Sequence, residues 1–162
     1  MKEIYELEKW IWTNEDFDQM GWHDSNIYSF AFYPEQLEFA LDIDYIFKWV
    51  HPKSGGKYFK FWISPVTMVF ENIYDLVMDI DTISGLEIDD INRDNPQKPR
   101  NAQYIGKQTE WSWNIECHQG LISLKPVGFK MFVNSAPVLS KNQSLGLESR
   151  GGINFTRGKT QT

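Results

Sequence analysis

Apolar and polar residues alternate along much of the chain, and a period of two is typical of β-strands that have one face in the core. The clearest example is residues 37–47, where the odd positions are all apolar or aromatic and the even positions include Asp42 and Asp44. An aromatic-rich segment, residues 27–33, precedes it across Pro34-Glu35. The pattern predicts two neighbouring antiparallel strands joined by a tight turn, with one solvated face along residues 37–47.

The same alternation marks a series of further short strands. We expect them at residues 58–64, 66–70, 76–81, 86–89, 110–118, 121–125 and 128–134, and residues 145–149 could pair with 153–156. Pro65 has no N–H for a strand ladder, so an edge, a bulge or a strand boundary is expected there. Residues 93–101 contain Pro96 and Pro99 among polar residues and are expected to form a flexible loop.

Helical spacing is confined to the beginning of the chain. Thr13 or Asn14 is suited to cap a short helical turn that runs to Met20 and ends at Gly21. The remaining pattern is one of short strands joined by turn-rich links. We therefore predict a single, mainly β domain over residues 1–162: an antiparallel β-sandwich or rolled barrel with a short N-terminal helix.

The 162-residue chain is acidic, with 16 Lys and Arg against 22 Asp and Glu and a net charge of -6. Proteins that bind nucleic acid or anionic membranes need a surplus of cations, so neither partner is expected. Cys117 is the only cysteine, which excludes an internal disulfide and fits a reducing compartment. The first residues form no continuous apolar segment of the signal-peptide type, and we expect a cytoplasmic protein.

The negative charge is unevenly distributed, because residues 1–100 carry a net charge of -10 and residues 101–162 a net charge of +4. Between residues 71 and 94 the carboxylates are opposed by a single cation, Arg93. This segment is either a solvated outer face or a docking surface for a basic protein. The candidate interaction surface consists of Glu71, Asp75, Asp79, Asp81, Glu87, Asp89 and Asp90.

Aromatic residues are abundant, with 7 Trp, 7 Tyr and 11 Phe. Some of them, such as Phe61 and Trp62, fall on opposite faces of one expected strand. Either a second sheet buries them, or part of the set forms an exposed platform that stacks on sugar rings.

A candidate ligand or metal site lies at Trp22-His23-Asp24, directly before an expected strand. Asp42 and Asp44 share one face of the next strand and could approach it. One histidine with two or three carboxylates suits a divalent cation, or a general base that an acid orients. The alternative is structural: His23 and Asp24 hydrogen-bond the backbone at the start of the strand.

Cys117-His118 resembles a nucleophile beside a base, but neighbours in a strand point to opposite faces and cannot form a dyad. Cys117 continues an apolar face and is expected to pack in the core. The glycine pairs at 55–56 and 151–152 match no phosphate-binding fingerprint, and no catalytic motif is present. These motifs therefore give no support for an enzyme, the question of activity stays open, and no cofactor is expected.

Three segments carry a resemblance to other proteins: Met20-Gly21-Trp22-His23-Asp24, Asp42-Ile43-Asp44-Tyr45-Ile46 and residues 61–72. In these the chain resembles an uncharacterised bacterial family of small β-rich cytosolic proteins, loosely similar to immunity proteins of polymorphic toxin systems. The similarity covers residues 10–90 and the Arg150-Gly151-Gly152-Ile153 end. It implies a bacterial, cytosolic β-rich domain and supplies no catalytic residues.

Two hypotheses follow from these observations. The first is a non-enzymatic interaction protein whose acidic, aromatic surface docks a basic partner, as an immunity protein docks a toxin domain. The second is a small enzyme or a ligand-binding or metal-binding β-domain with a site at His23, Asp24, Asp42 and Asp44. The second requires His23 and at least two carboxylates to converge on one point.

Overall fold

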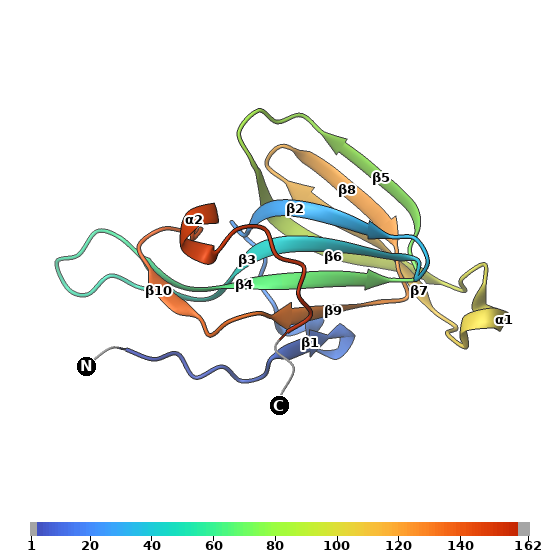
Figure 1. The fold of residues 1–162 in the computed structure, drawn as a ribbon, viewed down its shortest axis with the longest axis horizontal. Helices are drawn as coiled ribbons and strands as arrows, with labels where there is room; N and C mark the ends of the chain where they lie inside the picture. The colour runs from blue at the N-terminus through green and yellow to red at the C-terminus, as the bar shows by residue number, and fades with distance from the viewer. Residues whose placement is uncertain (1–2, 159–162) are drawn as a thin grey trace.

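The computed structural model describes residues 3–158, in which antiparallel strands dominate (Figure 1). The strands are β1 (Ile11–Thr13), β2 (Asn26–Tyr33), β3 (Glu38–Val50), β4 (Lys60–Glu71), β5 (Tyr74–Ile80), β6 (Leu86–Gln97), β7 (Glu110–Cys117), β8 (Gly120–Lys125), β9 (Gly128–Val133) and β10 (Val138–Ser140). Three short helical turns accompany them: η1 (Asn14–Gln19), α1 (Ala102–Ile105) and α2 (Leu147–Arg150). The mainly β fold with a short N-terminal helix is thus confirmed.

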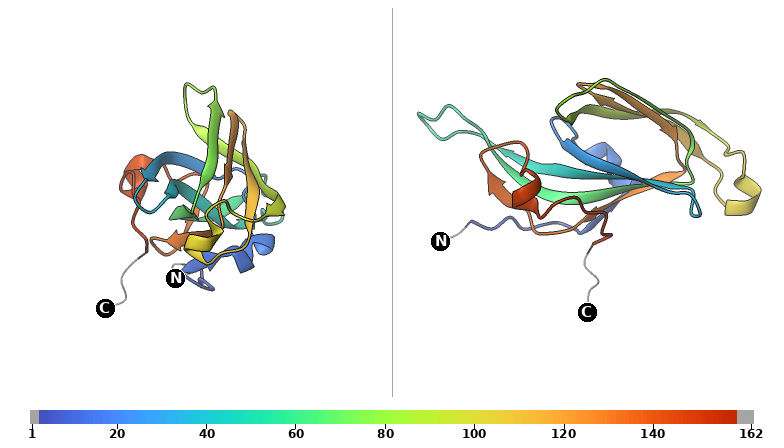
Figure 2. Two further views of the ribbon diagram at one scale, coloured as in Figure 1. Left: turned by 90° about the vertical axis from the view of Figure 1, so that its right-hand side faces the viewer. Right: turned by 45° about the horizontal axis from the view of Figure 1, so that its top comes forward.

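All strands belong to one open antiparallel sheet in the order β1-β9-β4-β3-β2-β6-β7-β8-β5, with β10 added to β4. The joint between β2 and β6 is only two residue pairs long, Asn26 with Glu87 and Ile27 with Leu86. The sheet bends there, and its two halves lie over one another as the layers seen in Figure 2. The sequence pattern predicts a β-sandwich or a rolled barrel, and the observed sheet is open and not closed into a barrel.

The core lies between the two halves of the sheet, where their inner faces meet. Trp113 on β7 is 1% exposed and packs edge-to-face on Phe17, Phe70 and Phe129, with ring centroids 4.8, 5.4 and 5.2 Å away. Edge-to-face packing of this kind is the favoured arrangement of aromatic rings. The second half of the sheet therefore buries much of the aromatic content.

The strand β3 is buried on both faces, which differs from the solvated face expected for residues 37–47. Its odd positions enter the core, but Asp42 and Asp44 on the opposite face are also 0% exposed. They are covered by residues 138–158, here called the C-terminal strap, which crosses the outer face of β3 and β4 (Figure 1). The strap is attached through β10 and through the Thr67 hydroxyl, which donates to the carbonyl of Thr156 at 2.7 Å.

The strap also replaces the strand pair considered for residues 145–149 and 153–156. Residues 147–150 form the helical turn α2 instead, and Gly151 follows it with a φ of 85°. That left-handed conformation is strained for any other residue, and it ends the turn. The chain then returns along the sheet instead of pairing with itself.

Pro65 lies inside β4 and does not mark an edge or a strand boundary as expected. It is paired in register with Asp44 of β3, in the middle of the sheet. Its carbonyl accepts a hydrogen bond from the Asn134 N–H at 3.0 Å, on the side where β9 has just ended at Val133. Since the N–H and C=O of a strand residue point to the same neighbour, the missing donor of Pro65 interrupts no ladder bond to β3.

The flexible loop expected at residues 93–101 is largely a strand, because β6 continues to Gln97. The register of β6 against β7 shifts between Asp94 and Gln97, and Asn95 has a φ of 53°. Pro96 is accommodated in this irregular stretch, since a bulged residue is not required to donate to the ladder. No helix among residues 3–158 has the length and hydrophobicity needed to cross a membrane.

The aromatic core gives a first testable prediction. Trp113→Ala removes the side chain on which three aromatic rings converge, and we expect the free energy of unfolding to fall by about 3–5 kcal/mol. Urea denaturation followed by circular dichroism measures this loss. Tyr104→Ala is the matched control, because this side chain is 81% exposed. A loss at Trp113 no larger than at Tyr104 would contradict the position of the core.

Candidate metal centre

The structure divides the four residues of the expected site into two groups. Asp42 and Asp44 lie under the C-terminal strap and bind Arg150. His23 and Asp24 lie in the turn before β2 and face residues of β6 and of the turn after β7. Only the second group belongs to a cluster that can bind a ligand from outside.

Arg150 forms the centre of the first group, and all three charged side chains are 0% exposed. Its two terminal nitrogens donate to Asp42 Oδ1 and Oδ2 at 2.6 and 2.8 Å, and Nε donates to Asp44 Oδ1 at 3.0 Å. Burial alone lowers the pKa of an arginine, but the two carboxylates outweigh it and hold the pKa of Arg150 above its usual value. The guanidinium is therefore a fixed internal counterion.

The remaining carboxylate oxygens of this group are bonded as well. Asp44 Oδ2 accepts from the Tyr28 hydroxyl at 2.6 Å and from the Leu145 N–H at 2.7 Å. Asp42 Oδ2 accepts a further bond from the Asn154 N–H at 2.8 Å. Burial and then the hydrogen bond to Asp44 raise the pKa of Tyr28 to about 12. Asp42 and Asp44 are therefore structural residues with no oxygen free for a metal ion.

The second group begins with a turn that holds Asp24 in an unusual conformation. The Ser25 N–H donates to the Trp22 carbonyl at 3.2 Å, which closes the turn. Asp24 has a φ of 66°, in the left-handed region that aspartate tolerates better than most residues. Its N–H donates to the Ile88 carbonyl of β6 at 2.8 Å. That bond fixes Asp24 beside the two carboxylates that flank Ile88 in sequence.

Glu87 and Asp89 supply these two carboxylates from the beginning of β6. The register against β7 shifts between Ile88 and Asp90, so that one extra residue on β6 forms a bulge. Bulges of this kind change the direction of a side chain and are frequent beside functional sites. The His118 N–H donates to the Glu87 carbonyl at 2.9 Å, which brings the imidazole to the same place.

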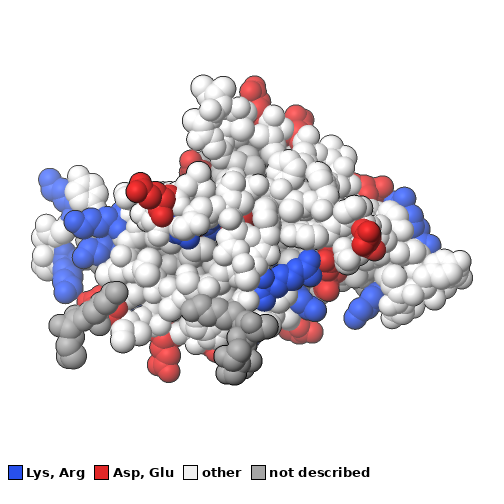
Figure 3. Space-filling view, in the orientation of Figure 1, with Lys and Arg blue, Asp and Glu red and all other residues white. Residues whose placement is uncertain are grey.

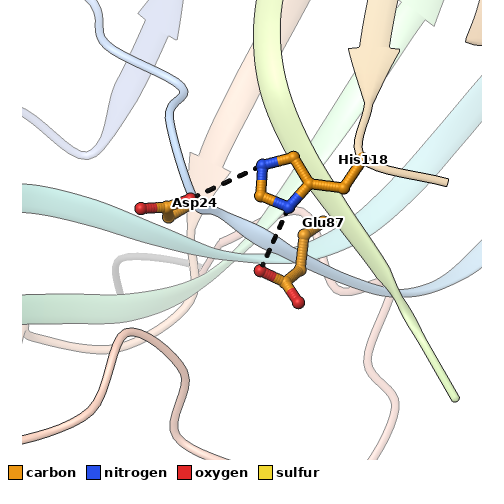
Figure 4. Close-up of side chains that lie close together, drawn as sticks. All are labelled: Asp24, Glu87 and His118. Atoms are coloured by element: carbon orange, nitrogen blue, oxygen red, sulfur yellow. Dashed lines mark ion pairs between the residues drawn. The ribbon is translucent and has the colours of Figure 1, made fainter. Parts of the chain in front are cut away.

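Five side chains meet here, and we call them the histidine–carboxylate cluster: His23, Asp24, Glu87, Asp89 and His118. Figure 4 shows the imidazole of His118 between Asp24 and Glu87, with Nε2 3.7 Å from Asp24 Oδ1 and Nδ1 3.6 Å from Glu87 Oε2. One ligand atom from each of these three residues lies within 4.8 Å of the other two. Asp89 Oδ1 adds a carboxylate 3.5 Å from His118 Nε2 and 3.7 Å from His23 Nε2.

The two spacings at His118 Nε2, to Asp24 and to Asp89, suit ligands that share a cation, whereas Glu87 faces the other ring nitrogen, Nδ1. Hydrogen bonds between nitrogen and oxygen have a length of about 2.7–3.2 Å, shorter than the separations around His118. Ligands arranged tetrahedrally at about 2.0–2.2 Å from a zinc ion lie about 3.3–3.6 Å apart. His23 Nδ1 lies 2.8 Å from Asp24 Oδ2. A carboxylate in that position orients metal-binding imidazoles.

The charge of the cluster also favours a cation. It has three carboxylates, and within residues 3–158 no lysine or arginine forms an ion pair with any of them. Asp24 is the most buried, with a side chain 13% exposed, and Gln143 of the C-terminal strap donates to its Oδ2 at 2.7 Å. Neutral donors leave the negative charge in place. The cluster can therefore bind a divalent ion.

Three members of the cluster were not recognised as site residues from the sequence. The sequence places Glu87 and Asp89 on the acidic interaction surface, and it sets His118 beside Cys117 in the chain and on the same strand face as Glu116. The alternation at Leu86-Glu87-Ile88-Asp89 does predict two carboxylates on one face. The sequence gives no indication that β6 lies between the turn at Asp24 and the end of β7.

Cys117 packs against the core as expected and is partly buried. Burial raises the pKa of its thiol to about 11, so that little thiolate forms at neutral pH. Its Sγ donates weakly to the Ile115 carbonyl at 3.8 Å. The structure thus agrees with the exclusion of a Cys-His dyad.

The expected acidic interaction surface is split by the fold. Glu71 lies 3.6 Å from Lys130, and Asp75 is bonded to both Lys125 and Arg100, which hold the pKa of that carboxyl below its usual value. These two carboxylates are neutralised within the chain. Glu87 and Asp89 belong to the histidine–carboxylate cluster, and three others remain exposed without such a partner among the described residues: Asp79, Asp81 and Asp90.

Comparisons with protein-family models, with curated proteins and with solved structures find no match to this chain. The assignment of a site therefore depends on its geometry alone.

The buried ion pairs give a second testable prediction. Arg150→Met leaves two buried carboxylates without a cation, and we expect the free energy of unfolding to fall by about 3–5 kcal/mol. Arg157→Met is the matched control, because its pair with Glu38 is partly exposed and is expected to contribute about 1 kcal/mol or less. Chemical denaturation measures both.

If Arg150→Met does not fold, the variant with Asp42→Asn and Asp44→Asn added tests the same point. Removing both charges is expected to restore part of the lost stability, since the main penalty is the uncompensated buried charge. Two results would contradict the buried ion pairs. One is that the stability losses of the three substitutions simply add, and the other is that Arg150→Met loses no more stability than Arg157→Met.

Proposed function

We propose that this protein binds a divalent transition-metal ion, with Asp24, Glu87 and His118 as ligands. The observation that carries the proposal is the convergence of three ligand atoms from three separate segments within 4.8 Å. Imidazole nitrogen together with carboxylate oxygen is a donor set that zinc and similar ions accept. His23 and Asp89 lie close enough to orient these ligands or to supply a fourth.

Three protein ligands leave one position of a tetrahedral ion for water or for a donor from another molecule. The side chain of His118 is 39% exposed, so the ion has access to solvent. We therefore propose a site that can exchange its fourth ligand, and not a closed structural site. The free thiol of Cys117 supports a reducing compartment, such as a bacterial cytoplasm, as the place where it acts.

Zinc titration tests the proposal. After treatment with EDTA, isothermal titration is expected to show one Zn²⁺ per chain, and His118→Ala or Asp24→Asn is expected to weaken binding at least about tenfold. His51→Ala is the matched control, since this exposed histidine lies outside the cluster.

Two results would reject the metal site. One is a wild-type protein that takes up no Zn²⁺ at micromolar concentrations. The other is an equal loss of affinity in His51→Ala and His118→Ala, which would assign binding to surface histidines in general.

A second function, docking of a basic protein, is supported by a row of residues on the outer face of β5, β8, β7 and β6. The row consists of Asp79, Leu121, Glu116 and Asp90, each paired in register with the next. Leu121 is 38% exposed between carboxylates, and Val77 beside it on β5 is 58% exposed. We propose that this acidic row binds a cationic partner, the class to which a basic toxin domain belongs.

The pairing of Glu116 with Asp90 makes this second proposal testable without the partner. Like charges directly opposite one another destabilise a sheet, so Asp90→Asn is expected to raise the free energy of unfolding by about 0.2–1 kcal/mol. Asp81→Asn, in the loop after β5, is the control and is expected to change it by less. A decrease in the free energy of unfolding in Asp90→Asn would show that this carboxylate stabilises the fold. That result would contradict the proposal that the acidic row binds a partner.

A further inference from the structure

The loop between β3 and β4 projects from the body of the molecule (Figures 1 and 2) and differs from it in charge. We call residues 48–60 the basic hairpin. It carries Lys48, Lys53, Lys57 and Lys60, all of them exposed. Residues 45–70 contain no aspartate or glutamate. The hairpin is therefore a cationic projection on an acidic protein.

The cations of the basic hairpin are free to contact a partner. Among residues 3–158 none of its lysines forms an ion pair with a carboxylate. Figure 3 shows lysine and arginine side chains gathered at the end of the molecule where the hairpin projects in Figure 1. Fields from charges farther away than the Debye length of about 10 Å are largely screened, so the local charge governs what binds there. The net charge of -6 is a total for the chain and does not show that the hairpin is locally positive.

Aromatic rings lie between these lysines on one face of the hairpin. Trp49 packs edge-to-face on Phe61 and Phe59, with ring centroids 5.0 and 5.8 Å away, and His51 lies 4.9 Å from Phe59. Trp49 is 37% exposed, and Phe59 is 36% exposed. Their mutual packing fixes the orientation of the rings and leaves part of each face open to solvent.

The opposite face of the hairpin has a shallow cleft of about 300 Å³. Tyr58, which is 83% exposed, lines it together with Val50, Lys53 and Lys60. Glu3 also lines the cleft and partly offsets the positive charge there. Both faces thus combine aromatic or apolar surface with ammonium groups.

We propose that the basic hairpin binds single-stranded nucleic acid, with the lysines on the phosphates and Trp49 and Tyr58 stacking on bases. Aromatic platforms within a cationic groove are the general means by which single strands are bound without sequence preference. A membrane is the less suitable partner, because the tip Lys53-Ser54-Gly55-Gly56-Lys57 is polar and the aromatic residues lie at the base of the hairpin. This binding requires no metal ion, and the hairpin adjoins the histidine–carboxylate cluster where Trp49 packs edge-to-face on His23, with ring centroids 6.2 Å apart.

The experiment is fluorescence anisotropy of a labelled oligothymidylate of about 15 nucleotides, in about 50 mM salt with EDTA present. The wild-type protein is expected to bind. Lys53→Glu with Lys57→Glu is expected to weaken binding more than about tenfold and to flatten its salt dependence. Trp49→Ala with Tyr58→Ala is expected to weaken binding at least about fivefold and to leave the salt dependence unchanged.

Matched controls separate the hairpin from unspecific attraction. Lys98→Glu with Lys107→Glu makes the same change in net charge in another exposed segment, and Tyr104→Ala removes another exposed ring. Both are expected to bind the oligonucleotide like the wild-type protein. Thermal melts confirm that each variant is folded.

Three results would overturn the proposal. They are the absence of binding by the wild-type protein, equal losses in the control and hairpin variants, and tighter hairpin-dependent binding to phosphatidylglycerol vesicles than to the oligonucleotide.

Discussion

The buried ion pairs between Arg150 and the carboxylates of Asp42 and Asp44 are the interaction on which the rest of the structure depends. β3 lies between β4 and β2 in its half of the sheet, and both acidic side chains point out of the core. Burying them without a cation is too costly, and exposing them would leave the outer face of β3 and β4 uncovered. Arg150 resolves this conflict, and its fork of donors attaches the C-terminal strap to the sheet.

The strap connects the buried ion pairs of Arg150 to the candidate metal centre. Leu145 of the strap bonds Asp44, and Gln143, two residues earlier, bonds Asp24. Two acidic groups therefore lie along one segment and are treated differently. The first receives a cation and a complete set of hydrogen bonds, whereas the second receives a neutral amide and two histidines. An arginine or lysine in the strap near Asp24 would have neutralised this carboxylate as Arg150 neutralises Asp42 and Asp44. Because the strap supplies only a neutral amide there, we propose that the cluster binds a ligand.

The sequence predicts local features well and long-range ones poorly. The alternation correctly separates Cys117 from His118 and places the β2–β3 and β7–β8 hairpins, because each depends on neighbours in sequence. Of the four expected site residues, His23 and Asp24 lie in the histidine–carboxylate cluster, whereas Asp42 and Asp44 pair with Arg150. The sequence did not indicate that pairing, because Asp42 and Arg150 are 108 residues apart. The same holds for Pro65, whose tolerance in β4 depends on where β9 ends.

The net charge describes this protein only as a sum. The value of -6, on which the expectation of no nucleic-acid partner depends, adds together the buried ion pairs of Arg150, a cluster rich in carboxylates and a hairpin that has none. Folding itself requires the charges around Arg150, and their removal is expected to cost stability. The paired carboxylates of Asp90 and Glu116 and the lysines of the basic hairpin compensate nothing within the described chain. Local rules of stability are broken mainly where function requires it, and this is the physical reason for proposing these uncompensated charges as binding sites.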